Sequence, residues 1–224
     1  MNAAAVVMLS KSPAIDSCKT RLTNRLTPDQ ANELQDALIQ DTWAHIAPEQ
    51  GYHLWVAAPS FESLTYFRPL THRLLIQQGI HLGHKMRHVT TTLFSMGYSQ
   101  VILIGSDMPL MTRCLLSEAM EKLHTANCVL GPAEDGGYYL IGMTPQTPDP
   151  FASIPWGTSQ VLAKTLQHLK TAPSPYALLT RNRDIDTWAD LLFYTESPNL
   201  TPAIPHLLSW AQQHVGVLAH TQSP

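Results

Sequence analysis

Short apolar runs alternate along the chain with longer segments in which apolar residues recur at helical spacing. The runs predict buried strands, and Val101–Ile104, a continuous run of β-branched residues and leucine, is the clearest of them. In chain order the expected strands are Ala3–Leu9, Tyr52–Ala58, Leu74–Gln77, Val101–Ile104, Cys128–Leu130, Tyr138–Met143 and Tyr176–Leu179.

Helix signals occupy the segments between these runs. Thr27-Pro28-Asp29-Gln30 combines an N-cap threonine, a proline at the first helical position and a glutamine three residues after the cap, which predicts a helix from there to about Ala47. Gly97 is expected to end a second helix, Leu82 to about Met96. The other expected helices are Leu115–Leu123, Thr158–Leu169, Thr187–Tyr194 and Leu207–His214.

Alternating strands and helices are typical of a three-layer α/β sandwich, in which a mostly parallel central sheet is covered on both faces. No internal repeat or low-complexity linker divides the 224 residues, so a single domain over 1–224 is expected, with 199–224 as a C-terminal helical extension. In such sheets ligands bind at the carboxyl ends of the strands. This rule selects the loops after Leu9, Ile104 and Leu130.

Composition narrows the possible partners. The formal net charge is −3 and the pI is about 6.4, so nothing draws the chain as a whole toward nucleic acid. The odd number of cysteines, Cys18, Cys114 and Cys128, argues against a disulfide framework. Ala3–Leu9 is too short for a signal or membrane segment. We therefore expect a cytoplasmic protein that binds neither nucleic acid nor membrane.

The loop after Leu9 carries Lys11, Lys19 and Arg21. Backbone N–H groups and these cations would suit a phosphate. The loop is neither a P-loop nor a Rossmann turn, because GxxxxGK[ST] and GxGxxG are both absent. The alternative is a solvated basic loop.

Acidic residues follow two further segments. Asp107, in Gly105-Ser106-Asp107-Met108-Pro109, comes directly after a buried strand, where a carboxylate can hold a hard cation; the alternative is a turn before proline. Asp186, in Asp184-Ile185-Asp186-Thr187, is a candidate second ligand, although a helix N-cap around Thr187, completed by Asp190, would also explain this segment.

A glycine-containing segment and a group of histidines each allow two interpretations. The glycines of Glu134-Asp135-Gly136-Gly137-Tyr138 would let the backbone approach a ligand, but Asp-Gly is also a strong hairpin signal. A zinc site at His81, His84 and His88 is disfavoured, since no acidic or cysteine ligand is adjacent. Neither GxSxG nor HExxH occurs, so covalent catalysis has no support.

Taken together, the loops resemble a known bacterial family. The pattern comprises Lys11-x-Pro13, Lys19-Thr20-Arg21-Leu22, Gly105-Ser106-Asp107-Met108-Pro109, Gly131-Pro132-Ala133-x-Asp135-Gly136-Gly137-Tyr138, Pro155-Trp156 and Asp184-Ile185-Asp186-Thr187, over about residues 3–193. It resembles glycosyltransferase-A-like proteins of the nucleotide-diphospho-sugar transferase superfamily that are associated with radical-SAM or selenium-related gene clusters. The Lys-Thr-Arg-Leu and Asp-Ile-Asp-Thr segments are also similar to 2-phospho-lactate guanylyltransferase.

The resemblance implies a glycosyltransferase-A fold with Mg²⁺ or Mn²⁺ as cofactor. It implies Asp107 and Asp186 as metal ligands, and Asp107 and Asp135 as catalytic residues. The implied nucleotide and phosphate ligands are Lys11, Lys19, Arg21 and Ser106, and the implied substrate pocket is lined by Gly136, Gly137, Tyr138 and Trp156. Two positions depart from the family pattern: His81 replaces an aspartate and Lys85 an arginine, which points to altered specificity or reduced activity. The first loop also lacks the family's glycine near Ile15-Asp16.

Three functions stay open on these grounds. Glycosyl transfer from a nucleotide sugar to a small-molecule acceptor is preferred because the family implies it. Nucleotidyl transfer from a nucleoside triphosphate is the alternative, because Lys19 and Arg21 suit a triphosphate and because Asp107, between Ser106 and Met108, is a lone aspartate without a DxD motif. A non-catalytic nucleotide-binding partner is the third. The acceptor, the base and the oligomer, including a possible homodimer, are not indicated.

Overall fold

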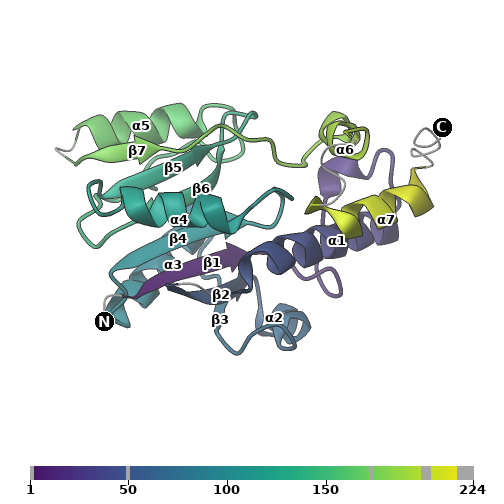
Figure 1. The fold of residues 1–224 in the computed structure, drawn as a ribbon, viewed down its shortest axis with the longest axis horizontal. Helices are drawn as coiled ribbons and strands as arrows, with labels where there is room; N and C mark the ends of the chain where they lie inside the picture. Colours follow the sequence, from purple (N-terminus) through teal and green to yellow (C-terminus); the bar gives the residue numbers. More distant parts are fainter. Residues whose placement is uncertain (1–2, 49–50, 172–173, 198–202, 216–224) are drawn as a thin grey trace.

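A seven-stranded sheet forms the centre of the structure, a computed structural model that describes residues 3–48, 51–171, 174–197 and 203–215 (Figure 1). The strand order is β3-β2-β1-β4-β6-β5-β7. The strands are β1 Ala4–Leu9, β2 Tyr52–Ala58, β3 Leu74–Ile76, β4 Gln100–Gly105, β5 Cys128–Pro132, β6 Tyr138–Met143 and β7 Tyr176–Leu178. Within the described residues β6 runs antiparallel to its neighbours β4 and β5, and every other pairing is parallel.

Helices cover both faces of this sheet. On one face lie α1 (Pro28–Ile46), α2 (Phe61–Phe67) and α4 (Arg113–Lys122), and on the other α3 (Leu82–Ser95) and α5 (Val161–Thr171). Alternate side chains of β4 point to opposite faces of the sheet, and both faces are buried. Ile102 and Ile104 belong to the apolar cluster on one face, and Val101 and Leu103 belong to the cluster on the other. The predicted mostly parallel three-layer α/β sandwich is confirmed.

A third apolar cluster lies beside the sheet, where α7 (Pro205–His214) packs along α1 together with η1 (Thr20–Leu22) and α6 (Trp188–Thr195) (Figure 1). The Asp41 carboxylate of α1 accepts hydrogen bonds from the backbone N–H groups of His206 and Leu207, at 3.0 and 2.9 Å, in the first turn of α7. This terminal helix is therefore packed on α1. Residues 199–202 and 216–224 of the expected extension lie outside the described residues.

Most of the predicted elements are present. The capping box predicted at Thr27 and Gln30 opens α1. The short elements α2 and η1 were not predicted, because segments of seven and three residues carry little periodicity. α5 begins at Val161, not at Thr158 as predicted. No helix in the described part of the chain is long and apolar enough to cross a membrane.

Candidate functional site

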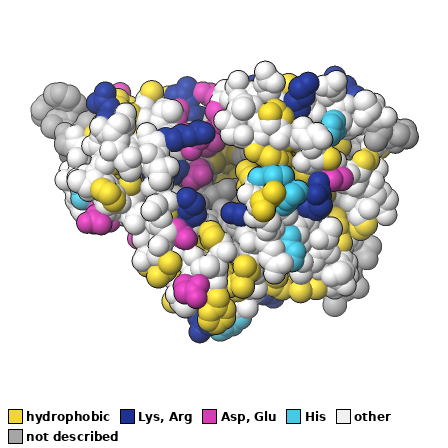
Figure 2. All heavy atoms as spheres, turned by 180° about the vertical axis from the view of Figure 1, so that it is seen from behind, with side chains coloured by type: hydrophobic (Ala, Val, Ile, Leu, Met, Phe, Trp, Pro, Cys, Tyr) yellow, Lys and Arg dark blue, Asp and Glu magenta, His cyan; other side chains and the backbone are white. Residues whose placement is uncertain are grey.

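The loops that follow β1, β4, β5 and β7 meet at the carboxyl edge of the sheet and surround two adjoining hollows. Figure 2 shows this side of the molecule hollowed near its middle, where acidic and basic side chains gather. One hollow has a volume of about 470 Å³ and the other about 350 Å³. Five residues line both: Leu9, Arg21, Leu82, Asp107 and Asp186. The two hollows are therefore parts of one cleft, joined at its charged centre.

The smaller hollow is lined by four cationic side chains, and we call it the cationic hollow. These are Lys11, Lys19, Arg21 and Lys85. At its base the Gln35 Nε2 donates to the hydroxyl oxygens of Ser106 and Ser10, at 2.7 and 3.3 Å, and the two hydroxyls lie 3.0 Å apart. This buried network joins the ends of β1 and β4 to α1. The Ser106 hydroxyl, a predicted phosphate ligand, is thus already hydrogen bonded within the protein.

Two cations of the first loop tie that loop to the acidic segments. Lys19 has a left-handed backbone, with φ of 45°, an unusual conformation for a residue with a side chain. Its Nζ donates to Asp107 Oδ1 and to the Ile185 carbonyl, both at 2.6 Å, and its side chain is only 4% exposed. Arg21 donates to Asp186 Oδ2 at 2.8 Å. Lys19 and Arg21 therefore both face the acidic centre, where each is paired with a carboxylate.

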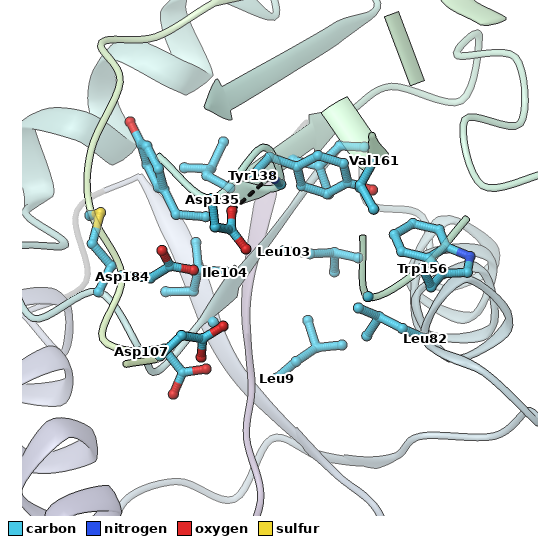
Figure 3. A pocket seen from close by; sticks show the side chains of 18 of the residues that line it. Leu9, Leu82, Leu103, Ile104, Asp107, Asp135, Tyr138, Trp156, Val161 and Asp184 are labelled. Atoms are coloured by element: carbon cyan, nitrogen blue, oxygen red, sulfur yellow. Dashed lines mark hydrogen bonds between the residues drawn. The ribbon is translucent and has the colours of Figure 1, made fainter. Parts of the chain in front are cut away.

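Three carboxylates converge at this centre. Asp135, Asp184 and Asp186 each offer an oxygen within 4.8 Å of the others, and Asp107 lies beside them (Figure 3). Asp135 is oriented by the backbone N–H of Gly137, which donates to its Oδ1 at 2.7 Å. We call Asp135, Asp184 and Asp186 the acidic triad.

Local structure explains why Asp184 and Asp186 point the same way. Ile185, fully buried between them, anchors the segment through its N–H, which donates to the Asp107 carbonyl at 2.8 Å. With Ile185 buried, the carboxylates of Asp184 and Asp186 both line the cleft. The helix N-cap that was the alternative explanation for Asp186 is present, but Thr187 and Asp190 form it. The N-cap role therefore does not occupy Asp186.

The electrostatics of the triad favour a cation. Burial, followed by the charges of Asp135 and Asp186, raises the pKa of Asp184 to about 7. Burial also raises the pKa of Asp186, although Lys19 and Arg21 oppose that rise. Crowded carboxylate oxygens are the hard donors that Mg²⁺ and Mn²⁺ bind, so the triad fits such an ion. The sequence had indicated Asp107 and Asp186 as ligands and missed Asp184, whose signal was its spacing of two from Asp186.

The larger hollow is mainly apolar, and we call it the apolar hollow. In Figure 3 its labelled walls, Leu9, Leu82 and Trp156, lie across from Asp107, Asp135 and Asp184. Of the predicted pocket residues, Gly137, Tyr138 and Trp156 line it. Gly136 lies behind the wall: its φ is 89°, and a Cβ there would come within 2.2 Å of the Ser159 carbonyl oxygen. The Asp135-Gly136 turn therefore joins β5 to β6 and also forms part of the pocket wall, so both interpretations of this segment apply.

The two departures from the family pattern have local explanations. His81 is the N-cap of α3: its Nδ1 accepts from the backbone N–H of His84 at 3.4 Å, and the centroids of the two tilted rings lie 3.8 Å apart. An aspartate would cap the same helix, so part of its role is retained. Lys85 keeps a positive charge in the cationic hollow. The group of converging ligand side chains found among the described residues is the acidic triad, and it contains none of these histidines.

Comparisons with known proteins agree with this architecture. A family model with the description "Uncharacterized protein conserved in bacteria (DUF2064)" matches residues 42–158. The crystal structure of a proposed nucleotide-diphospho-sugar transferase from Desulfovibrio desulfuricans G20 is 27% identical, with a TM-score of 0.85 over 96% of both chains. The resemblance to nucleotide-diphospho-sugar transferases is therefore confirmed. No curated protein sequence matches the chain.

More distant structures share the fold alone. A CMP:2-keto-3-deoxy-manno-octonic acid synthetase complexed with CTP is 13% identical, with a TM-score of 0.55 over 87% of this chain and 100% of that one. A cytidylyltransferase from Leptospira borgpetersenii serovar Hardjo-bovis is 9% identical, with a TM-score of 0.55 over 100% and 99% of the two chains. The fold is thus common to sugar transferases and nucleotidyltransferases.

Proposed function

The chain belongs to the DUF2064 family, and we propose that it is a divalent-metal-dependent transferase that moves a glycosyl group from a nucleotide-diphospho-sugar to a small-molecule acceptor. One observation carries the proposal: the acidic triad lies where a cation-lined hollow meets an apolar one, at the carboxyl edge of a parallel sheet. The 27% identical transferase structure supports the same class.

In this proposal each part of the donor would bind in a different part of the cleft. A nucleoside diphosphate is strongly anionic while the chain carries a formal charge of −3, so its phosphates need local cations. The cationic hollow offers Arg21 and Lys85. Phosphates bound there would lie at the junction with the triad, and the sugar would lie at the charged end of the apolar hollow, next to the carboxylates. The acceptor then approaches from the side of Trp156.

In the proposed reaction different carboxylates bind the metal and accept the proton. Asp184 and Asp186 would hold the metal, with Asp107 beside them, and the metal would neutralise charge on the departing diphosphate. The acceptor hydroxyl oxygen forms a bond to the anomeric carbon as the bond from that carbon to the diphosphate oxygen breaks, and that oxygen keeps the electron pair. Asp135, the most exposed member of the triad, takes the hydroxyl proton.

Lys19 is a positioning residue in this scheme. Its buried ammonium bridges Asp107 and the Ile185 carbonyl, and it thereby joins the loops after β4 and β7. With Nζ already held at two oxygens, Lys19 supports the acidic centre. The other two cations of this loop also line the hollow and could contact a phosphate: Arg21, whose side chain is 59% exposed, and Lys11, whose Nζ donates to the Ser17 carbonyl at 2.9 Å.

Nucleotidyl transfer is the second candidate, because four cations line the hollow and would also suit a triphosphate. Product analysis separates the two reactions. The protein is incubated with Mg²⁺ or Mn²⁺ and either a panel of nucleotide sugars or a panel of nucleoside triphosphates. Glycosyl transfer releases a nucleoside diphosphate from the sugars, whereas nucleotidyl transfer releases pyrophosphate from the triphosphates.

Asp186→Asn is the matched inactive variant, and Asp149→Asn, at an ion pair with Arg87 outside the cleft, is the control. We expect diphosphate release that Asp186→Asn abolishes and Asp149→Asn retains. Pyrophosphate release instead would replace the proposal with nucleotidyl transfer. Nucleotide binding without turnover of either panel would indicate a binding partner, not an enzyme.

A further inference from the structure

The polar groups of the apolar hollow are unevenly distributed. Its carboxylates and Arg21 gather at one end, next to the cationic hollow, and the hydroxyls of Thr158 and Ser159 belong to an exposed loop. Between them the wall is mainly apolar and includes Leu9, Leu82, Met86, Leu103, Trp156 and Val161. Tyr138 and Tyr139 also line it, but the Tyr138 hydroxyl is buried within the protein and the Tyr139 hydroxyl donates to the Thr180 carbonyl at 2.9 Å. A ligand in this hollow therefore meets charge at one end and hydrocarbon or aromatic surface along its length.

This wall is tightly built. A Cβ on Gly83 would lie 2.6 Å from the Trp156 Nε1 and 2.8 Å from two ring carbons, so the glycine lets α3 and the indole pack in direct contact. Trp156 also meets Phe151 and Tyr138, with ring centroids 6.4 Å away in each case. Because neighbours hold the indole on several sides, the wall is a preformed surface with little room to rearrange.

Such a surface selects by polarity. A polyhydroxylated molecule lying along it would bury hydroxyl groups that find no partner, which weakens binding. A hydrocarbon or aromatic body would instead exchange water for apolar contact. The volume of about 470 Å³ lies within the range of small-molecule sites, so there is room for such a body beyond the sugar.

We propose that the acceptor has an apolar body, alkyl or aromatic, that ends in a single nucleophilic hydroxyl. The inference rests on the proposed function, because it takes the charged end of the hollow as the place where the sugar is transferred. The body lies against Trp156 and Leu82, and the hydroxyl lies next to Asp135. On reaction the hydroxyl oxygen bonds to the anomeric carbon, the diphosphate leaves with its electron pair, and the proton passes to Asp135.

A homologous series of alcohols tests this assignment. Binding of 1-butanol, 1-hexanol and 1-octanol is measured by calorimetry with and without Mg²⁺ and a nucleoside diphosphate, beside inositol as a polyhydroxylated probe. We expect affinity to rise about three- to fourfold for each added methylene until the hollow is filled. Inositol should bind at least tenfold more weakly than 1-hexanol.

Two neighbouring residues provide a matched pair of variants. Leu82, 46% exposed, lines the hollow, whereas Ile80, 89% exposed, does not. Leu82→Gln should weaken 1-octanol binding about fivefold or more, and Ile80→Gln should leave it unchanged. Since both side chains are exposed, neither change should unfold the protein, and thermal melts check this.

The outcomes distinguish a failure of the apolar-acceptor inference from a failure of the proposed transferase function. If the nucleoside diphosphate binds with Mg²⁺ but affinity does not grow with chain length, or inositol binds as well as 1-hexanol, the apolar acceptor is overturned and the transferase proposal stands. Equal effects of Leu82→Gln and Ile80→Gln would also overturn it. If no nucleotide binds at all, the proposed function fails, and the acceptor assignment fails with it.

Discussion

Lys19 Nζ lies 2.6 Å from Asp107 Oδ1, and the two partners differ sharply in exposure: the lysine side chain is 4% exposed and the aspartate 43%. The asymmetry matters because an unpaired charge is costly only where water cannot reach it. The same ammonium also donates to the Ile185 carbonyl, so it joins three loops of the candidate site. This one lysine therefore links local stability to the geometry of the acidic centre.

The asymmetry predicts unequal costs for the two halves of the pair. Asp107→Asn leaves a buried ammonium without its counter-charge and should destabilise the protein by about 3 kcal/mol. Lys19→Met leaves a carboxylate that water can reach and a carbonyl at Ile185 without its donor, and because no unpaired charge is buried it should cost less than Asp107→Asn. Urea denaturation of both variants and of the double variant checks this. A double variant less stable than Asp107→Asn alone would contradict the account.

The pKa of Asp184, raised to about 7, predicts a pH-dependent stability. The folded state binds this proton more tightly than the unfolded state does, so the wild type should lose stability as pH rises from about 4 to 7. Asp184→Asn removes that loss. Above pH 7, without divalent metal, the variant should melt higher, by about 2–4 °C for each kcal/mol regained.

The melting curves of both proteins should converge toward pH 3, where the wild-type carboxyl, whose usual pKa is 3.8, is protonated in both the folded and the unfolded state. Glu121→Gln, at an exposed position on α4, is the control and should follow the wild type at every pH. A gain that is the same at pH 4 and pH 8 would show that the carboxyl group is not its source.

Metal binding should offset the loss of stability that the ionised Asp184 carboxylate causes. Saturating Mn²⁺ or Mg²⁺ should stabilise the wild type, by about 2.7 kcal/mol at a concentration one hundred times the Kd. Asp184→Asn and Asp186→Asn should lose most of this gain, and Asp149→Asn should keep it. Thermal melts with and without chelator measure the effect. If the triad variants respond to metal as the wild type does, the ion binds elsewhere.

Arg21 provides a test of the cationic hollow. Arg21→Ala should weaken the binding of a nucleoside diphosphate about tenfold, since it removes a charge-assisted contact. Arg25→Ala is the matched control: its guanidinium stacks over Trp188, 5.4 Å from the ring centroid, and it does not line either hollow. Calorimetric titration would compare the two, and equal affinities would place the phosphates outside this hollow.

Gly136 and Gly97 separate backbone strain from steric conflict. Both have positive φ, 89° and 90°. A Cβ on Gly97 would have no neighbour within 4 Å, whereas one on Gly136 would lie 2.2 Å from the Ser159 carbonyl oxygen. Gly97→Ala should therefore cost about 1–2 kcal/mol from strain alone, and Gly136→Ala clearly more. Similar denaturation midpoints for the two variants would mean that the loop at Ser159 moves to accommodate the added methyl group at little cost.

Local patterns in the sequence were enough to predict the long elements. The Thr27 and Gln30 capping box, the helix end at Gly97 and the β-branched run of β4 each act over a few residues, so they are visible without knowledge of the rest of the chain. The alternation of strands and helices likewise predicted the mostly parallel three-layer fold, because few other architectures bury both faces of such strands.

Side-chain partners across the cleft depended on the tertiary structure. Lys19 and Arg21 were expected to face phosphate, yet Lys19 is held by Asp107, 88 residues away, and Arg21 meets Asp186, 165 residues away. Asp184 became a candidate ligand only when Asp135 was found beside it. Sequence spacing sets which side of a segment a residue faces, but convergence depends on how distant loops dock, and long-range packing decides that.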